Sequence, residues 1–153
     1  MAKEIERKFL VNGCFEPSMA DSRHHIVQAY LSVRPESTVR VRIIDDRGFL
    51  TVKGKNAGAA RSEWEYEIPV ADARQMIEEC SAGPVINKMR YRIGRWEVDV
   101  FSGHLGGLAV AEIELASEKE DIVLPDFAGR EVTGDPRYYN SVLSSATELP
   151  PLV

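Results

Sequence analysis

The sequence is poor in cysteine and has no long apolar run, and each shortage excludes a class of protein. No apolar stretch approaches the roughly 20 residues with which a helix crosses a bilayer, so we expect no membrane association. The N-terminus is charged from Lys3 onward and lacks the apolar segment of a signal peptide, which predicts a cytoplasmic protein. The two cysteines, Cys14 and Cys80, lack the spacing of a metal site, and we expect free thiols that are buried or half-buried.

Composition and charge favour a single globular domain over residues 1–153. Hydrophobic residues make up 44% of the chain and charged residues 28%, which is ordinary for a folded protein of this length. The formal net charge of -5 argues against nucleic-acid binding, because proteins that bind nucleic acid are usually basic. The sequence leaves open whether the protein is a monomer or a homodimer.

Alternation of apolar and polar residues with period two predicts eight β-strands. The predicted strands are Lys3–Asn12, His25–Arg34, Thr38–Asp45, Gly48–Gly54, Arg61–Pro69, Val85–Ile93, Arg95–Phe101 and Leu108–Ala116. Short connections, with tight turns at 46–48 and 94–95, indicate antiparallel pairing. We therefore expect a mainly β (α+β) protein whose eight antiparallel strands close into a barrel.

Two segments with helical features interrupt this pattern. Apolar residues recur every three or four positions over 70–80, which predicts an amphipathic helix. Near the C-terminus Asp135 precedes Pro136, the pattern of a helix cap and first turn, and predicts a helix through Leu143. Both helices need an apolar surface, and we expect to find them packed on the outside of the barrel.

Like charges occupy alternate positions along six of the predicted strands. The charged residues on these faces are Glu4, Glu6 and Lys8; Arg40 and Arg42; Lys53 and Lys55; Arg61, Glu63, Glu65 and Glu67; Lys88, Arg90 and Arg92; and Glu112 and Glu114. Such a face can simply be solvated, as in many antiparallel sheets. However, two like charges about 7 Å apart repel by roughly 2 kcal/mol at an effective dielectric of 20, so several crowded pairs require counterions.

If the helices lie outside the barrel as expected, this charged face must point inward. If helices cover the apolar face from outside, the charged face lines the barrel, which then forms a tunnel for a ligand. Paired carboxylates suit Mg²⁺ or Mn²⁺, whereas clustered guanidinium and ammonium groups suit phosphate oxygens. A metal-bound chain of phosphates satisfies both sets. We favour its hydrolysis by a metal-held water, since no Cys/His pair, serine nucleophile motif or His-rich motif competes.

The motif Glu4-x-Glu6-x-Lys8 begins a resemblance that extends over nearly the whole chain. It continues through Gln28-Ala-Tyr30-Leu31, Arg40-Val-Arg42, Lys53-Gly-Lys55, Arg61-Ser-Glu63-Trp-Glu65, Lys88-Met-Arg90 and Glu112-Ile-Glu114, in that order. The chain thus resembles the CYTH superfamily of triphosphate tunnel metalloenzymes, and most of all its short, single-domain bacterial members. This superfamily includes class IV adenylate cyclases, thiamine triphosphatases and inorganic triphosphatases.

The resemblance implies a closed eight-stranded tunnel that binds one or two divalent cations and a triphosphate. It assigns metal binding to Glu4, Glu6, Glu112 and Glu114, with Glu63 and Glu65 as further contributors. It assigns phosphate binding to Lys8, Arg40, Arg42, Lys53, Lys88 and Arg90. Catalysis would depend on Glu4, Glu6, Lys8 and Lys88, and Lys88 could alternatively accept a proton from the attacking water.

Some neighbouring residues and the choice of substrate have more than one interpretation. Tyr30 could hydrogen-bond Lys8 or a phosphate, or simply pack, and Asp99 could orient a basic residue or bind metal. Lys55 and Arg92 are expected to be solvated. Inorganic tripolyphosphate is the favoured substrate because no base-reading pocket is evident. A class IV-type adenylate cyclase, a thiamine or nucleoside triphosphatase, and a non-catalytic polyphosphate-binding module remain alternatives.

Overall fold

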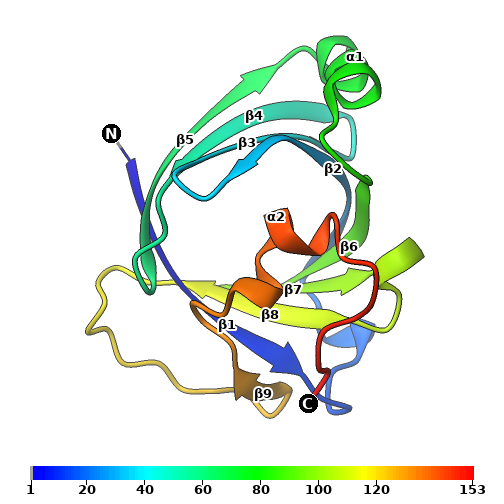
Figure 1. Ribbon diagram of the computed structural model, residues 1–153. Helices are drawn as coiled ribbons and strands as arrows, with labels where there is room; N and C mark the ends of the chain where they lie inside the picture. The colour runs from blue at the N-terminus through cyan, green and yellow to red at the C-terminus, as the bar shows by residue number, and fades with distance from the viewer. Residues whose placement is uncertain (1) are drawn as a thin grey trace.

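A closed ring of eight antiparallel strands is the centre of the computed structural model, which describes the backbone of residues 2–153 and the side chains of residues 4–153 (Figure 1). The ring contains β1 (Ala2–Val11), β2 (Ser22–Arg34), β3 (Ser37–Ile44), β4 (Arg47–Gly54), β5 (Ala60–Ile68), β6 (Ile86–Ile93), β7 (Trp96–Phe101) and β8 (Ala109–Glu114). Neighbours follow the order β5-β4-β3-β2-β6-β7-β8-β1, and pairing of β5 with β1 closes the barrel. The predicted fold class and all eight predicted strands are confirmed.

The first strand of the barrel divides its pairing between two partners. Its N-terminal half pairs with β5, where Glu4 lies opposite Arg61. Its C-terminal half pairs with β8, where Glu6 lies opposite Glu114 and Lys8 opposite Glu112. Because residues opposite each other in an antiparallel pair share a face, this register places the opening acidic motif and the acids of β8 on one wall.

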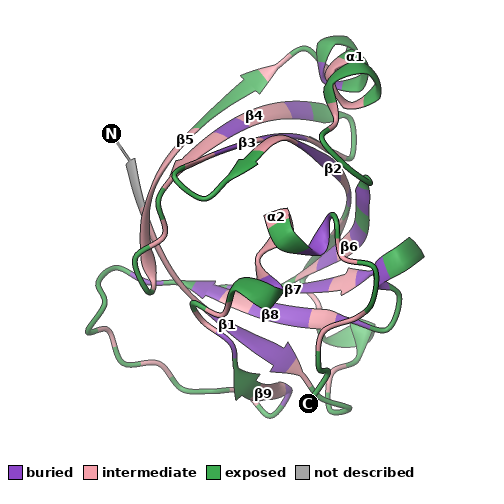
Figure 2. Ribbon diagram, in the orientation of Figure 1, coloured by how far each residue is buried: buried purple, intermediate pink, exposed green. Residues whose placement is uncertain are grey.

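A short ninth strand, β9 (Ala128–Glu131), lies outside the ring along β1 and was not predicted, because its four residues carry no clear alternation. The segment that leads into it contributes Phe127 to an outer apolar layer. There the Phe9 and Trp96 rings lie 5.7 Å apart, and the Trp96 and Phe127 rings lie 6.0 Å apart. Figure 2 shows the corresponding concentration of buried residues in β1, β7 and β8. This layer covers the half of the barrel that no helix reaches.

Helix α1 (Val70–Cys80) covers the other half, against β2, β3 and β4, as predicted. Ala73 is the fully buried residue of this helix, and it faces Gly48 of β4. The close approach requires a residue without a side chain at position 48. The helix is therefore fixed to the outer face of β4 by steric fit as well as by apolar burial.

The C-terminal segment differs from the expectation of a helix on the outside. It forms a 3-10 turn, η3 (Pro136–Tyr138), followed by α2 (Asn140–Leu143), and Asp135 caps η3 by accepting a hydrogen bond from the Arg137 amide at 3.1 Å. Tyr138 and Leu143 are buried against residues of the inner face: Leu10, Ile86 and Val110. Figure 1 shows α2 within the ring of strands. The segment thus fills one end of the interior.

Two sequence expectations about membrane spans and cysteines also meet the structure. No helix within residues 2–153 is long and apolar enough to cross a membrane. Cys14 and Cys80 are free, as expected, but both are exposed, so the expectation of buried or half-buried thiols is wrong. Cys14 follows β1 in a turn, and Cys80 lies at the end of α1 on its solvent side, where neither position reaches the core.

Gly48→Ala is expected to destabilise the protein, because a Cβ at this position would lie 2.8 Å from the Ala73 Cβ and 3.1 Å from the Ile68 carbonyl oxygen. Overpacking of this kind costs about 1–3 kcal/mol. Urea denaturation should show this loss in the free energy of unfolding. Gly83→Ala, whose added Cβ meets nothing within 4 Å, is the control, and an equal loss in both variants would contradict the fit of α1 on β4.

Candidate functional site

The open part of the barrel interior is a hollow of about 190 Å³ whose lining consists of charged side chains and Asn140. The lining residues are Glu4, Glu6, Glu63, Glu65, Glu97, Glu112, Glu114, Arg40, Arg42, Lys53, Arg90, Arg92 and Asn140. The structure thus directs the charged strand faces inward, as the sequence predicts, and brings most of the predicted site residues to one hollow.

The acidic wall is formed where β1 meets β8. Burial would by itself raise the pKa of Glu112, but Lys8, whose Nζ lies 3.3 Å from Glu112 Oε1, and the cations of β6 lower it to about 2. Glu6 is in the opposite situation. Burial, together with the negative charges of Glu112 and Glu4, raises the pKa of Glu6 to about 8.

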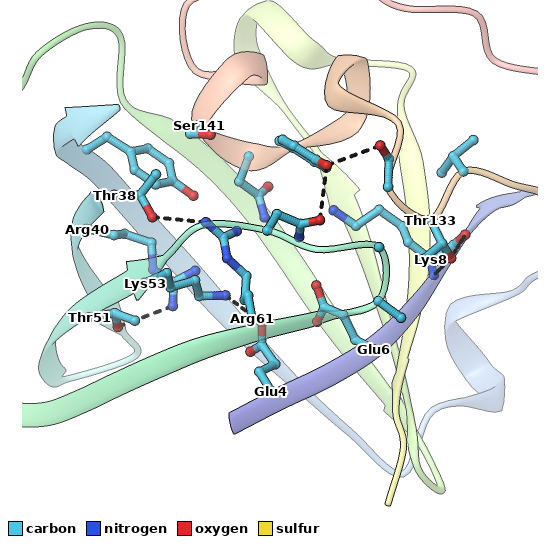
Figure 3. A pocket seen from close by; sticks show the side chains of 18 residues that line it. Glu4, Glu6, Lys8, Thr38, Arg40, Thr51, Lys53, Arg61, Thr133 and Ser141 are labelled. Atoms are coloured by element: carbon cyan, nitrogen blue, oxygen red, sulfur yellow. Dashed lines mark hydrogen bonds and ion pairs between the residues drawn. The ribbon is translucent and has the colours of Figure 1, made fainter. Parts of the chain in front are cut away.

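Lys8 and Lys53 favour the charged form of Glu6, but they do not offset burial and the two neighbouring acids. In the part of the chain with described side chains, no group donates a hydrogen bond to Glu6 or forms an ion pair with it. Figure 3 shows Glu6 and Lys8 extending from the same side of β1 towards the C-terminal segment. Glu4, by contrast, accepts a hydrogen bond of 3.0 Å from Lys53, which also lies 3.6 Å from Glu63.

The chemistry of this wall fits a divalent cation. Hard divalent cations take carboxylate oxygens as ligands, and further positive charge would favour the carboxylate form of Glu6, whose pKa stays raised beside two other acids in spite of Lys8 and Lys53. As the side chains of residues 4–153 stand, no three acids converge on one point. Lysines 8 and 53 instead neutralise Glu112 and Glu4, which are the acids that a cation would otherwise bind.

The basic wall lies across the hollow on β3 and β4. Arg42 donates a hydrogen bond of 3.0 Å to Glu65, and Arg40 lies 3.7 Å from the same carboxylate oxygen. Thr51 also donates to Glu65, at 2.7 Å. Burial and the positive charges of Arg40 and Arg90 lower the pKa of Arg42 to about 10. The Glu65 carboxylate is thus shared by two neighbouring guanidinium groups. Because one negative charge faces two positive charges, this wall can bind an additional anion.

A buried ion cluster connects β6 to β7. Arg90 donates two hydrogen bonds to Asp99, at 2.8 and 2.9 Å, and Lys88 Nζ lies 2.7 Å from Asp99 Oδ2. Burial opposes ionisation of Asp99, but Arg90 and Lys88 keep its pKa well below the usual range. Burial lowers the pKa of Lys88 to about 8, although Asp99 partly opposes this effect. The expectation that Asp99 orients a basic residue is confirmed.

The remaining sequence expectations are resolved as follows. Tyr30 is buried in the inner apolar cluster, as the packing interpretation requires, and it also lines the cavity that Lys8 lines. Lys55 is exposed, and Arg92, with 48% of its side chain exposed, is partly solvated. Glu114 is exposed although it lines the hollow.

The C-terminal segment adds groups to the site that sequence reasoning missed. The Tyr138 carbonyl accepts a hydrogen bond of 3.0 Å from Lys8 Nζ, and Asn140 and Ser141 line the cavity above β1 (Figure 3). Arg61 also lines this cavity, held by the Thr38 hydroxyl at 3.3 Å. A backbone carbonyl leaves no signal in a sequence, and asparagine and serine in a short helix are too common to indicate a site.

Comparisons with known proteins agree with this geometry. The CYTH domain family model matches residues 2–139. An inorganic triphosphatase of Acetivibrio thermocellus is 48% identical over 147 residues, which cover 94% of each chain. An inorganic triphosphatase of Nitrosomonas europaea is 35% identical, over 92% of this chain and 96% of that protein. A crystal structure of an inorganic triphosphatase, 32% identical, superposes with a TM-score of 0.64 over 97% of this chain and 100% of its own.

The raised pKa of Glu6 predicts a pH-dependent stability. The folded protein binds this proton more tightly than the unfolded chain, so the stabilisation is fully present below about pH 4.5 and is lost as the pH rises through about 8. Glu6→Gln stays neutral at every pH. In EDTA its free energy of unfolding should exceed that of the wild type by at least about 1 kcal/mol at about pH 8.5, and the gap should close towards about pH 4.5.

Glu114→Gln is the matched control for this prediction, because Glu114 lies opposite Glu6 in the ladder but is exposed. Urea denaturation at several pH values measures both variants. A gap of the same size at every pH for Glu6→Gln would contradict the electrostatic account of this carboxyl.

Proposed function

Because the chain belongs to the CYTH domain family, we propose that it is a divalent-metal-dependent enzyme that hydrolyses a phosphoanhydride bond of inorganic tripolyphosphate. The observation that carries this proposal is the division of one hollow into an acidic wall with an uncompensated carboxyl and a basic wall with a surplus of guanidinium groups. A cation and a polyanion bound together would neutralise both walls.

The acidic residues Glu4, Glu6, Glu112 and Glu114 would hold the divalent cation, which we take to be Mg²⁺ or Mn²⁺. Glu63, which faces Glu4 across Lys53, is placed to contribute. Glu65 already accepts hydrogen bonds from Arg42 and Thr51, so its contribution to metal binding would be smaller. When bound, the cation would neutralise charge on the phosphates and favour ionisation of a water molecule.

The basic residues would bind and orient the phosphates. The proposed phosphate ligands are Lys8, Arg40, Arg42, Lys53, Lys88 and Arg90. Guanidinium groups match phosphate oxygens in geometry and remain charged throughout the reaction. Attack of water on a terminal phosphorus would break the P–O bond of the anhydride and release orthophosphate and pyrophosphate.

The two buried lysines have different roles in this scheme. Burial opposes the charged form of Lys8, but Glu112 and Glu6 raise its pKa, so Lys8 remains an ammonium group that binds phosphate. The pKa of Lys88 is lowered to about 8, mainly by burial, so a fraction of Lys88 is neutral at mildly alkaline pH. As an alternative to binding phosphate as a cation, a neutral Lys88 can accept a proton from the attacking water, and this role suits Lys88 better than Lys8.

The nature of the hollow favours an inorganic substrate. Among the described residues, those that line the hollow offer no apolar surface on which a nucleoside base or a thiazole ring would stack. The tyrosines near it, Tyr30 and Tyr139, line the adjoining cavity above β1. The C-terminal segment occupies one end of the barrel, which shortens the space for an organic substituent. The relatives that match most of this chain are inorganic triphosphatases by name, which supports the same substrate class.

Phosphate release from a panel of substrates tests the proposed activity. With Mg²⁺ or Mn²⁺, tripolyphosphate should be cleaved at least about tenfold faster, by kcat/KM, than pyrophosphate, ATP, GTP or thiamine triphosphate. EDTA should abolish the release, because the acidic wall would lose its counterion. Pyrophosphate and cyclic AMP from ATP would indicate a cyclase, and binding of tripolyphosphate without release of orthophosphate would indicate a binding module.

Glu112→Ala and Glu4→Ala are each expected to lower metal-dependent phosphate release by at least about a hundredfold, because loss of one electrostatic catalytic group typically costs about 2.7–4 kcal/mol. Glu118→Ala, which removes an exposed acid outside the barrel, is the control and should retain the wild-type rate. Circular dichroism should confirm the fold of each variant. Wild-type rates for the Glu112 and Glu4 variants would contradict the metal assignment.

A further inference from the structure

Gln28 is a buried polar residue that is not among the proposed metal or phosphate ligands. It lies in the middle of β2 with 0% of its surface exposed. It pairs with Arg42 of β3 on one side and with Ile86 of β6 on the other, so it shares their inward face. Among the residues whose side chains are described, none offers a hydrogen-bond partner to its amide nitrogen or its amide oxygen.

An unpaired carboxamide at zero exposure requires an explanation. Burial of an amide without partners is unfavourable, and native proteins pair the large majority of such groups. A leucine of similar size at this position would pack without this cost. The residue is therefore disfavoured by stability alone, as expected of a side chain whose partner is a ligand.

Other buried donors lie on the two strands beside Gln28. The Nε atoms of Arg40 and Arg42, on β3, are buried and have no hydrogen-bond partner. On β6, the buried Lys88 Nζ has Asp99 as its ion-pair partner, at 2.7 Å. In the ladder, Gln28 is directly opposite Arg42 and diagonal to both Arg40 and Lys88. Four buried donors thus gather on three adjacent strands, β6, β2 and β3.

The charge of this cluster identifies the missing partner as an anion. Three of the four donors belong to cations, and the crowding of Arg40, Arg42 and Arg90 opposes the charged form of Arg42. A further lysine or arginine at position 28 would increase this repulsion. A glutamine supplies a donor without adding charge, and its amide oxygen can accept a hydrogen bond from a neighbouring cation.

We propose that Gln28 is a substrate-binding residue whose amide nitrogen donates a hydrogen bond to a phosphoryl oxygen held by Arg40, Arg42 and Lys88. This inference rests on the proposed function, because it takes the anion to be a phosphoryl group of tripolyphosphate. Gln28 does not itself line the hollow, but Arg42, its partner in the ladder, does, so the Arg42 side chain must move for the phosphoryl oxygen to reach the amide nitrogen of Gln28. The bound oxygen and one neighbouring cation then satisfy both amide atoms.

The test compares tripolyphosphate affinity with stability in the full chain. Gln28→Leu keeps the size of the side chain and removes its polar atoms, and Gln28→Met is a second variant in case the first does not fold. Calorimetry in EDTA, which prevents hydrolysis, should give a Kd for tripolyphosphate at least about tenfold weaker than that of the wild type, because a hydrogen bond to a charged group is lost. The Tm without ligand should be equal or higher, because an unpaired buried amide is removed.

Val27→Ala is the matched control, at the neighbouring position on the outer face of β2. It should lower the Tm and leave the Kd unchanged. An unchanged Kd in a folded Gln28 variant would overturn the inference. A lowered Tm in both Gln28→Leu and Gln28→Met would also overturn it, because Gln28 would then be a structural residue. Wild-type protein that binds tripolyphosphate without hydrolysing it would remove the proposed activity alone, whereas absence of binding by the wild type would overturn both.

Discussion

The divided pairing of β1 is the constraint on which the interior depends. Because β1 is hydrogen-bonded first to β5 and then to β8, Glu4 and Lys8 lie in the same strand but beside different partners. Glu4 forms an ion pair with Lys53 of β4, and Lys8 forms an ion pair with Glu112 of β8. A shift of the register by one residue would turn all these charges to the outer face, where the apolar layer around Phe9 and Trp96 packs. The pairing that closes the barrel therefore also brings the charged residues of the site together.

Most opposite charges inside the barrel form ion pairs. The proposed site lies where acids or cations are in excess. Where a carboxylate meets one cation, as Glu112 meets Lys8, both groups keep their charge at neutral pH. Where the ratio is unequal, burial and the surplus of like charge together shift the pKa, upward for Glu6 among acids and downward for Arg42 among arginines. These two residues lie on opposite walls of one hollow. A ligand of a single sign would relieve only one of them, which favours a cation and a polyanion together.

The sequence predicts the barrel well because its signal is local. Period-two alternation identifies all eight strands, and like charges at alternate positions identify the residues that line the hollow. The prediction fails where the inner face of a strand changes from charged to apolar residues. Leu10, Ile86 and Val110 continue the faces of Lys8, Lys88 and Glu112, yet they form an apolar floor on which Tyr138 and Leu143 pack. Only the barrel's closure shows that these three ends meet, so an outside position for the C-terminal helix was the natural expectation.

The apolar floor also determines how Lys8 functions. Packing of Tyr138 against this floor fixes its carbonyl oxygen 3.0 Å from Lys8 Nζ, while Glu112 lies 3.3 Å away on the other side. An ammonium group has three donors, so these two contacts leave one for a ligand. Lys8 is thus held in place before any phosphate arrives, and little side-chain entropy remains to be lost on binding. The C-terminal segment contributes to the site through its backbone and its packing, and for that reason its role becomes visible only in the folded structure.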